Sequence, residues 1–237
     1  MCIASLTPKI KLAFIAVCAA AAFAPQALAK DCGSYGFDGS ENYTAATIRK
    51  STGKVHFKDD AGKEQTTYLL PGDEVVVLSK EKDSSCAVYV SNKFAETAGW
   101  LPNADLSALP ATNTASAWHG TFVRDELGSI SKLKVLKNGH VEAMIEAYWA
   151  MSVELAKQGG VNVGDLGGDG ELKDGALHIA PDSSDNSPTK DNCAGDVRRI
   201  GTRYLLVEDN RDKLPSDEIL TCAGHNVGFT GLYIKKK

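Results

Sequence analysis

The sequence predicts an all-β protein: a small barrel followed by a second antiparallel β domain, either a barrel or a sandwich. Short stretches rich in Val, Tyr and Phe recur along the chain, and Pro, Gly or clusters of polar residues separate them. A stretch near the middle, rich in Ala, Thr, Pro and Asn, lacks this pattern and is typical of a linker. The 237 residues are enough for two buried cores.

Residues 1–29 have the composition of a secretory signal peptide, with two lysines, an apolar run and the cleavage site Ala27-Leu28-Ala29. The apolar run is too short to span a bilayer. Cys18 leaves a lipoprotein signal as an alternative, although the residue before it is larger than such a signal prefers. We therefore expect a mature chain that starts at Lys30 and is periplasmic or secreted.

The first domain is expected over residues 30–107. Its predicted strands are Thr44–Ile48, Lys54–Phe57, Val75–Leu78, Cys86–Val90 and a last stretch with Gly99-Trp100-Leu101. A Gly-Asp turn at Gly72-Asp73, two β runs and then Gly-Trp-Leu resemble the bacterial SH3-like (SH3b) domain. The resemblance implies a small barrel that engages peptidoglycan or protein partners through a groove. Tyr68, Tyr89 and Trp100 are the candidate ligand-binding residues, and packing of Trp100 at the edge of the core is the alternative.

Residues 108–116 are predicted to be the linker, and residues 117–237 the second domain. Trp118-His119-Gly120 looks like the start of a small lipocalin-like barrel. Further strands are expected at Ser131–Leu136, Val141 onward, Ala176–Ile179, Val197–Ile200, Tyr204–Glu208 and Val227–Ile234, with turns at Asn138-Gly139, Asp174-Gly175, Ile200-Gly201 and Asp209-Asn210. The stretch Cys222–Tyr233, preceded by Leu205–Asn210, looks like the closing strands of a poorly characterised domain of exported proteobacterial proteins. This resemblance spans about residues 117–237 and brings no known activity with it.

One segment of this domain has two interpretations. From Val141 to Leu155 every second residue is apolar, which predicts a strand, but Ala, Glu, Met and Leu are helix formers and Gly159 could cap a helix. We expect a strand over Val141–Trp149.

Four cysteines remain after removal of the signal peptide, and four cysteines allow three pairings. If each domain folds alone, Cys32 pairs with Cys86 and Cys193 with Cys222. Each bond would contribute roughly 3–4 kcal/mol. A zinc site is the alternative, but the wide spacing of the cysteines disfavours it.

No motif of convergent catalytic residues is present, so we expect no enzyme, no cofactor and no metal. A Cys193–His225 nucleophile pair is the alternative, although Cys222 competes for the same thiol. The histidines are scattered along the chain. The acidic stretch Asp165–Glu171 is predicted to be a solvated hairpin, with a calcium loop as the alternative. The polar run Asp182–Asn192 is predicted to be a long exposed loop.

The net charge of the mature chain limits the classes of partner that it could bind. Removing two lysines leaves 24 cationic and 30 acidic residues, a net charge of −6, which disfavours nucleic acid. Lys235–Lys237 is interpreted as a solvated tail. The first hypothesis is a periplasmic protein that binds a cell-wall component or a protein partner. The alternatives are an acidic inhibitor or immunity protein against a basic lysozyme-like or toxin enzyme, and a lipocalin-like carrier of a small apolar molecule.

Overall fold

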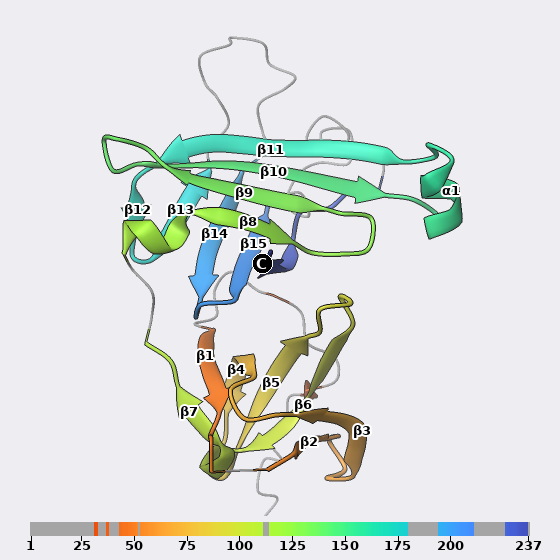
Figure 1. Ribbon diagram of the computed structural model, residues 1–237, viewed down its shortest axis with the longest axis vertical. Helices are drawn as coiled ribbons and strands as arrows, with labels where there is room; N and C mark the ends of the chain where they lie inside the picture. The colour runs from red at the N-terminus through yellow and green to blue at the C-terminus, as the bar shows by residue number, and fades with distance from the viewer. Residues whose placement is uncertain are drawn as a thin grey trace, which may run out of the picture. The chain divides into compact units, whose positions relative to one another are not determined.

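The computed structural model describes residues 31–32, 37, 43–51, 53–110, 114–179, 194–210 and 226–236 (Figure 1). All of them belong to one compact unit, Asp31–Lys237, and residues 1–30 form a separate unit outside the described residues. The predicted signal peptide therefore cannot be placed. The fold is all-β, as predicted, and is built from two antiparallel sheets. No helix among the described residues is long and apolar enough to cross a membrane.

The N-terminal sheet has seven strands in the order β3-β2-β6-β5-β4-β1-β7. Their bounds are β1 Thr44–Ile48, β2 Val55–Lys58, β3 Glu64–Leu69, β4 Glu74–Lys80, β5 Ser84–Val90, β6 Glu96–Pro102 and β7 Leu106–Ala108. Every strand contributes at least one buried side chain to a single apolar core, which includes Ile48, Phe57, Leu69, Val75, Ala87, Leu101 and Leu106. Because side chains alternate between the faces of a strand, one shared core means that the sheet curves around it.

The second sheet has nine strands in the order β11-β10-β9-β8-β16-β15-β14-β13-β12. Their bounds are β8 Gly120–Val123, β9 Ile130–Val135, β10 Val141–Trp149, β11 Asn162–Gly170, β12 Leu172–Lys173, β13 Ala176–Ile179, β14 Gly195–Ile200, β15 Tyr204–Asp209 and β16 Gly231–Lys235. Neighbours in the sheet are neighbours in sequence, and β16 returns to pair with β8. The first and last strands of the domain therefore lie side by side.

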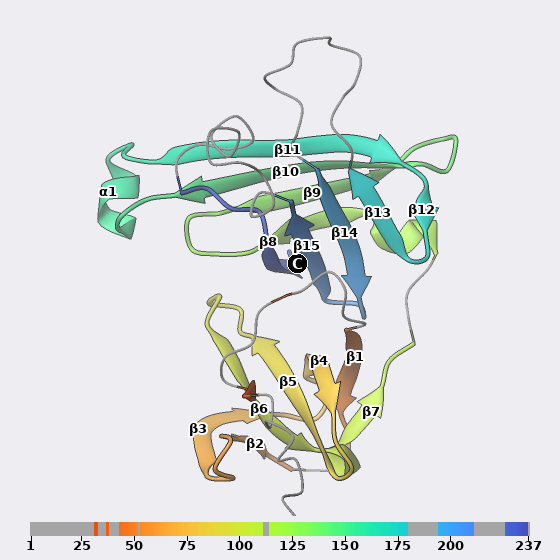
Figure 2. The same cartoon turned by 180° about the vertical axis from the view of Figure 1, so that it is seen from behind.

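This second sheet nearly closes into a barrel. Strands β8–β11 run across β13–β15 in both views (Figures 1 and 2), and β11 lies in contact with β13. A Cβ added to Gly170 on β11 would lie 3.4 Å from the Leu177 side chain on β13. Large buried side chains fill the interior, among them Trp118, Phe122, Ile145, Phe229 and Tyr233. The barrel is therefore a packed core at these positions.

Several predicted elements are confirmed and others are wrong. The strand Val141–Trp149 is confirmed, and a short helix α1, Val153–Lys157, follows it. The predicted hairpin at Asp165–Glu171 is wrong, because residues up to Gly170 belong to β11, which pairs with β10 along nine residue pairs. The predicted strand Val227–Ile234 is wrong at its start, since β16 begins only at Gly231. The η3 turn, Ala115–Trp118, precedes β8.

The Cys32–Cys86 disulfide is confirmed, with Cα atoms 5.6 Å apart and a sequence separation of 54 residues. It joins the N-terminal arm to β5. The Cys193–Cys222 pair lies outside the described residues, as do His225 and the loop Asp182–Asn192.

Besides the core of each sheet, a third apolar cluster contains residues of both sheets. Ala45, Val76, Val88 and Val90 of the N-terminal sheet pack with Ile200, Tyr204, Leu206, Leu232 and Ile234 of the second. The residues of the second sheet alternate with its interior residues, so the cluster forms on the outer face of β15 and β16.

Candidate functional site

The turn between β14 and β15 is held by a carboxylate of the other sheet. Glu74, at the start of β4, is buried. Its Oε1 accepts hydrogen bonds from Thr202 N at 2.8 Å and Arg203 N at 3.0 Å, and its Oε2 accepts one from Thr202 Oγ1 at 2.7 Å. Gly201 adopts a φ of +62°, and a Cβ at this position would overlap the Glu74 carboxylate. Glycine is therefore required for the close approach.

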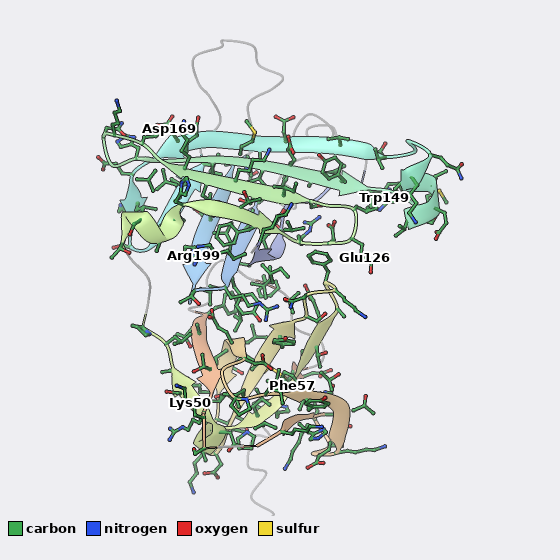
Figure 3. The ribbon with its side chains drawn as sticks, in the orientation of Figure 1. Lys50, Phe57, Glu126, Trp149, Asp169 and Arg199 are labelled. Atoms are coloured by element: carbon green, nitrogen blue, oxygen red, sulfur yellow. A yellow bond between two sulfur atoms is a disulfide. The ribbon has the colours of Figure 1, made fainter. Side chains whose placement is uncertain are left out.

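Arg199 forms hydrogen bonds to the same turn from the inside of the barrel. Its side chain is only 8% exposed, and Figure 3 shows it near the end of β14. Its guanidinium donates to Thr202 O at 2.7 Å and to Tyr204 O at 3.0 Å. Burial lowers the pKa of Arg199, and the Glu74 carboxylate partly offsets this by favouring the charged form. The turn thus lies between an anion that accepts its N–H groups and a cation that donates to its carbonyls.

Tyr204, the first residue of β15, reaches into the N-terminal sheet. Its hydroxyl donates to Glu74 O at 2.7 Å and accepts from Val90 N at 3.4 Å. Burial raises the pKa of Tyr204 far above its usual range, and Arg203 only partly opposes this. The phenol is therefore neutral and serves as a fixed link between the two sheets.

Arg203 lies over Tyr89. The guanidinium carbon is 5.0 Å from the centre of the Tyr89 ring and 5.3 Å from that of Tyr204. Its Nη2 also donates to Val90 O and, at 3.2 Å, to Asn92 Oδ1. A guanidinium stacked on aromatic rings and fixed by hydrogen bonds gives a rigid, charged wall.

Beside the β14–β15 turn lies a pocket of about 510 Å³. Its walls are Gly72, Asp73, Glu74, Tyr89, Asn92, Thr202, Arg203, Lys235 and Lys236. The residues come from the β3–β4 turn and from β5 with its following turn, and on the other sheet from the β14–β15 turn and the end of β16. The pocket therefore exists only because the two sheets meet.

The structure does not bring the three predicted binding residues together. Tyr89 packs partly against the N-terminal core. Trp100 lies on the same face of β6 as Ala98, which packs on the cluster between the sheets. Since β5 and β6 pair in regular register, Tyr89 and Trp100 point to opposite faces. Of the three predicted residues, Tyr89 lines the pocket described above.

Trp100 and Tyr68 have other surroundings. Trp100 donates from Nε1 to Asp60 Oδ1 at 2.8 Å, and the same oxygen accepts from Cys32 N at 3.0 Å. The Trp100 indole and the backbone of the disulfide-linked arm thus share one carboxylate oxygen. Tyr68 is 43% exposed, with the Lys54 ammonium 4.2 Å from its ring centre.

The zinc and calcium alternatives gain no support from the described part of the chain. No group of three His, Cys, Asp or Glu residues there could hold a metal ion. His140 Nδ1 lies 3.4 Å from Asp169 and its Nε2 3.7 Å from Glu171, and His178 Nδ1 lies 2.9 Å from Asp196.

Sequence reasoning missed Glu74, Asn92 and Arg203 and placed Lys235 and Lys236 in a solvated tail. Both lysines are exposed, but they line the pocket. The one signal in the sequence was the Gly72-Asp73 turn, which marks the start of β4 without indicating a partner. The chain matches no family model, no curated protein and no solved structure.

Proposed function

We propose that this protein is a non-catalytic binding protein of the periplasm or of the secreted fraction, which uses the pocket beside its SH3-like sheet to recognise a cell-wall component or a protein partner. The observation that carries the proposal is the placement of Tyr89, a residue that sequence reasoning had singled out, in the wall of a pocket of 510 Å³. A pocket of this size is in the range that holds small ligands.

Two further features support the proposal. The Arg203 guanidinium is stacked on Tyr89 and fixed to Val90 and Asn92, so the aromatic wall is rigid before a ligand arrives. Such preorganisation reduces the entropy lost on binding. The Cys32–Cys86 disulfide is compatible with an oxidising compartment outside the cytoplasm, which is also where the cell wall lies.

The test is co-sedimentation of the chain from Lys30 to Lys237, disulfides intact, with purified cell-wall sacculi. We expect retention of the unaltered chain and at least about five-fold weaker binding of Tyr89→Ala, because truncating a central aromatic side chain costs about 1–3 kcal/mol. Tyr68→Ala is the matched control, since Tyr68 lies on the same sheet outside the pocket lining. Circular dichroism checks that both variants fold. Equal retention of all three proteins would refute the pocket as the binding site.

A second function, inhibition of a basic enzyme, is favoured by a different observation. On the outer face of the β10–β11 pair, Glu142 lies directly opposite Asp169 and Glu146 directly opposite Asp165. Figure 3 shows Asp169 near one end of this pair and Trp149 at the other. Lys134 lies 3.3 Å from Glu142 and His140 lies 3.4 Å from Asp169, so the first pair already has partners of its own. Like charges directly opposite each other destabilise a sheet, and a basic partner would relieve the repulsion between Glu146 and Asp165.

If this second function is correct, the immobilised chain should capture one basic protein from periplasmic extract. Glu146→Gln/Asp165→Asn should weaken that capture and slightly stabilise the free chain, since it removes one repulsive pair. Undiminished capture by the double variant would exclude this face. The carrier function stays a prediction, because no observation in the described residues favours it.

A further inference from the structure

The pocket that contains Tyr89 offers more free hydrogen-bond donors than acceptors. Its two carboxylates already serve the protein itself. Asp73 Oδ2 accepts from Leu70 N at 2.7 Å, and both oxygens of Glu74 accept from the β14–β15 turn. Asp73 Oδ2 and both Glu74 oxygens therefore already accept hydrogen bonds from the protein before a ligand enters.

A buried cation on the far side of the β14–β15 turn also offsets the negative charge of Glu74. The buried guanidinium of Arg199 holds the opposite side of the turn that Glu74 binds, and the two charges favour one another. Arg199 is not part of the pocket wall. Of the charges that remain on the wall, Asp73 is acidic, whereas Arg203, Lys235 and Lys236 are cationic.

The two lysines are held in place by their backbone and free at their ends. Lys235 N donates to Arg203 O at 2.8 Å, and Lys236 N donates to Thr121 O at 2.8 Å, so the strand end is fixed beside the pocket. Within the described ranges, neither ammonium forms a hydrogen bond or an ion pair. Both lysines line the pocket, and lysines without an ion pair attract anions.

Asn92 adds a neutral donor. Its Oδ1 accepts from Arg203 Nη2, and a guanidinium can only donate, so this hydrogen bond fixes which end of the amide faces the arginine. The amide NH₂ of Asn92 is then the end left to a ligand. The positive charge of the pocket thus comes from the second sheet and the neutral Asn92 donor from the N-terminal sheet, on a chain whose formal net charge is −4.

We propose that the pocket binds an oxyanion, a carboxylate or a phosphate, carried by a small ligand. Lys235, Lys236 and the Asn92 amide contact the oxyanion, and the Tyr89–Arg203 stack forms the wall against which the rest of the ligand lies. This inference rests on the proposed function, because it names the ligand chemistry of the same pocket. The volume of 510 Å³ leaves room for a molecule well beyond the oxyanion itself.

The test uses the simplest oxyanions. Acetate and inorganic phosphate are titrated separately, at constant ionic strength and pH, into isotope-labelled chain from Lys30 to Lys237. The side-chain NMR signals of Arg203 and Asn92 report binding. We expect saturable shifts, weakened at least about ten-fold in Lys235→Gln/Lys236→Gln. The control, Lys80→Gln/Lys82→Gln, removes the same charge from exposed positions outside the pocket lining and should bind as the unaltered chain does.

The two anions separate the possible sources. Tighter binding of acetate indicates a carboxylate ligand, and tighter binding of phosphate a phosphorylated one; both outcomes support the oxyanion site. Shifts that fail to saturate with either anion, or that are equal in both double variants, overturn it. Co-sedimentation with sacculi distinguishes this failure from that of the proposed function. If Tyr89→Ala loses sacculi and Lys235→Gln/Lys236→Gln keeps them, the pocket binds the wall without an oxyanion contact.

Discussion

Gly201 is the residue at which the two sheets leave least room. Its φ is +62°, and an added Cβ would overlap the Glu74 carboxylate and lie 2.7 Å from Ala45 Cβ. Gly139 also has a positive φ, +86°, but has no atom within 4 Å of an added Cβ. Both Gly→Ala changes place alanine in a left-handed conformation, at a cost of about 1–2 kcal/mol.

We therefore predict that Gly201→Ala lowers the free energy of unfolding by clearly more than Gly139→Ala, by an additional 1–3 kcal/mol or so for overpacking. Urea denaturation followed by tryptophan fluorescence measures both. Equal losses would show that the β14–β15 turn does not seat on Glu74 as described.

Tyr233 gives stability a dependence on alkaline pH. Its hydroxyl donates to Phe229 O at 3.0 Å, and burial raises its pKa from 10.0 to about 12, partly opposed by Arg124. Between pH 10 and pH 12 the unfolded chain loses this proton while the folded chain keeps it. Stability is therefore fully present below pH 10 and falls as the pH rises toward 12, by up to about 1.4 kcal/mol per pH unit for this group.

Tyr233→Phe should show a shallower decline over that range, although it starts about 1 kcal/mol lower through loss of the hydrogen bond. Denaturation midpoints measured from pH 9 to pH 11.5 or so test this. Parallel curves for the two proteins would contradict the raised pKa. Tyr204 shifts in the same direction, so the variant keeps part of the decline.

At the scale of elements, the Cys32–Cys86 bond fixes the N-terminal arm on β5. It closes a loop of 54 residues, and the chain-entropy argument assigns about 4 kcal/mol to such a loop. Cys32→Ser/Cys86→Ser should lower the free energy of unfolding by an amount of this order. Reductant should destabilise the unaltered chain by breaking this bond. In the variant the bond is absent, so reductant cannot lower stability through it. A double variant as stable as the unaltered chain would contradict the role of the bond.

Local patterns predicted most strands but not all. Alternation identified β10 from Val141 to Trp149, because its apolar residues face the barrel core at every second position. The same reasoning failed for β11, whose sequence from Asn162 to Gly170 contains four glycines and two aspartates. These residues disfavour strands, and pairing along the whole length of β10 overrides that preference.

The pocket could not be predicted because its residues are distant in sequence. Glu74 and Arg203 are 129 residues apart, and no local spacing relates them. Tyr89 was singled out as an aromatic residue in a predicted strand, whereas its partner Arg203 lies in a turn that the sequence indicated only through Gly201. The SH3-like resemblance itself remains a prediction, since it pointed to a groove within one domain and the pocket needs two sheets.

At the scale of the molecule, we propose that both sheets together form one binding site. The Glu74 carboxylate, the Tyr204 hydroxyl and the apolar cluster around them join the sheets over buried surface. A ligand in the pocket should consequently protect backbone on both sheets, whereas a partner on the acidic face of β10–β11 would protect a different region.

The most direct measurement is hydrogen–deuterium exchange of the chain from Lys30 to Lys237, with and without soluble fragments released from sacculi. We predict added protection in four segments of the pocket: Gly72–Glu74, Tyr89–Asn92, Thr202–Arg203 and Lys235–Lys236. Segments around Tyr68 should not change. Saturating fragments that protect neither sheet, or that protect one sheet alone, would contradict the claim that the two sheets share the site.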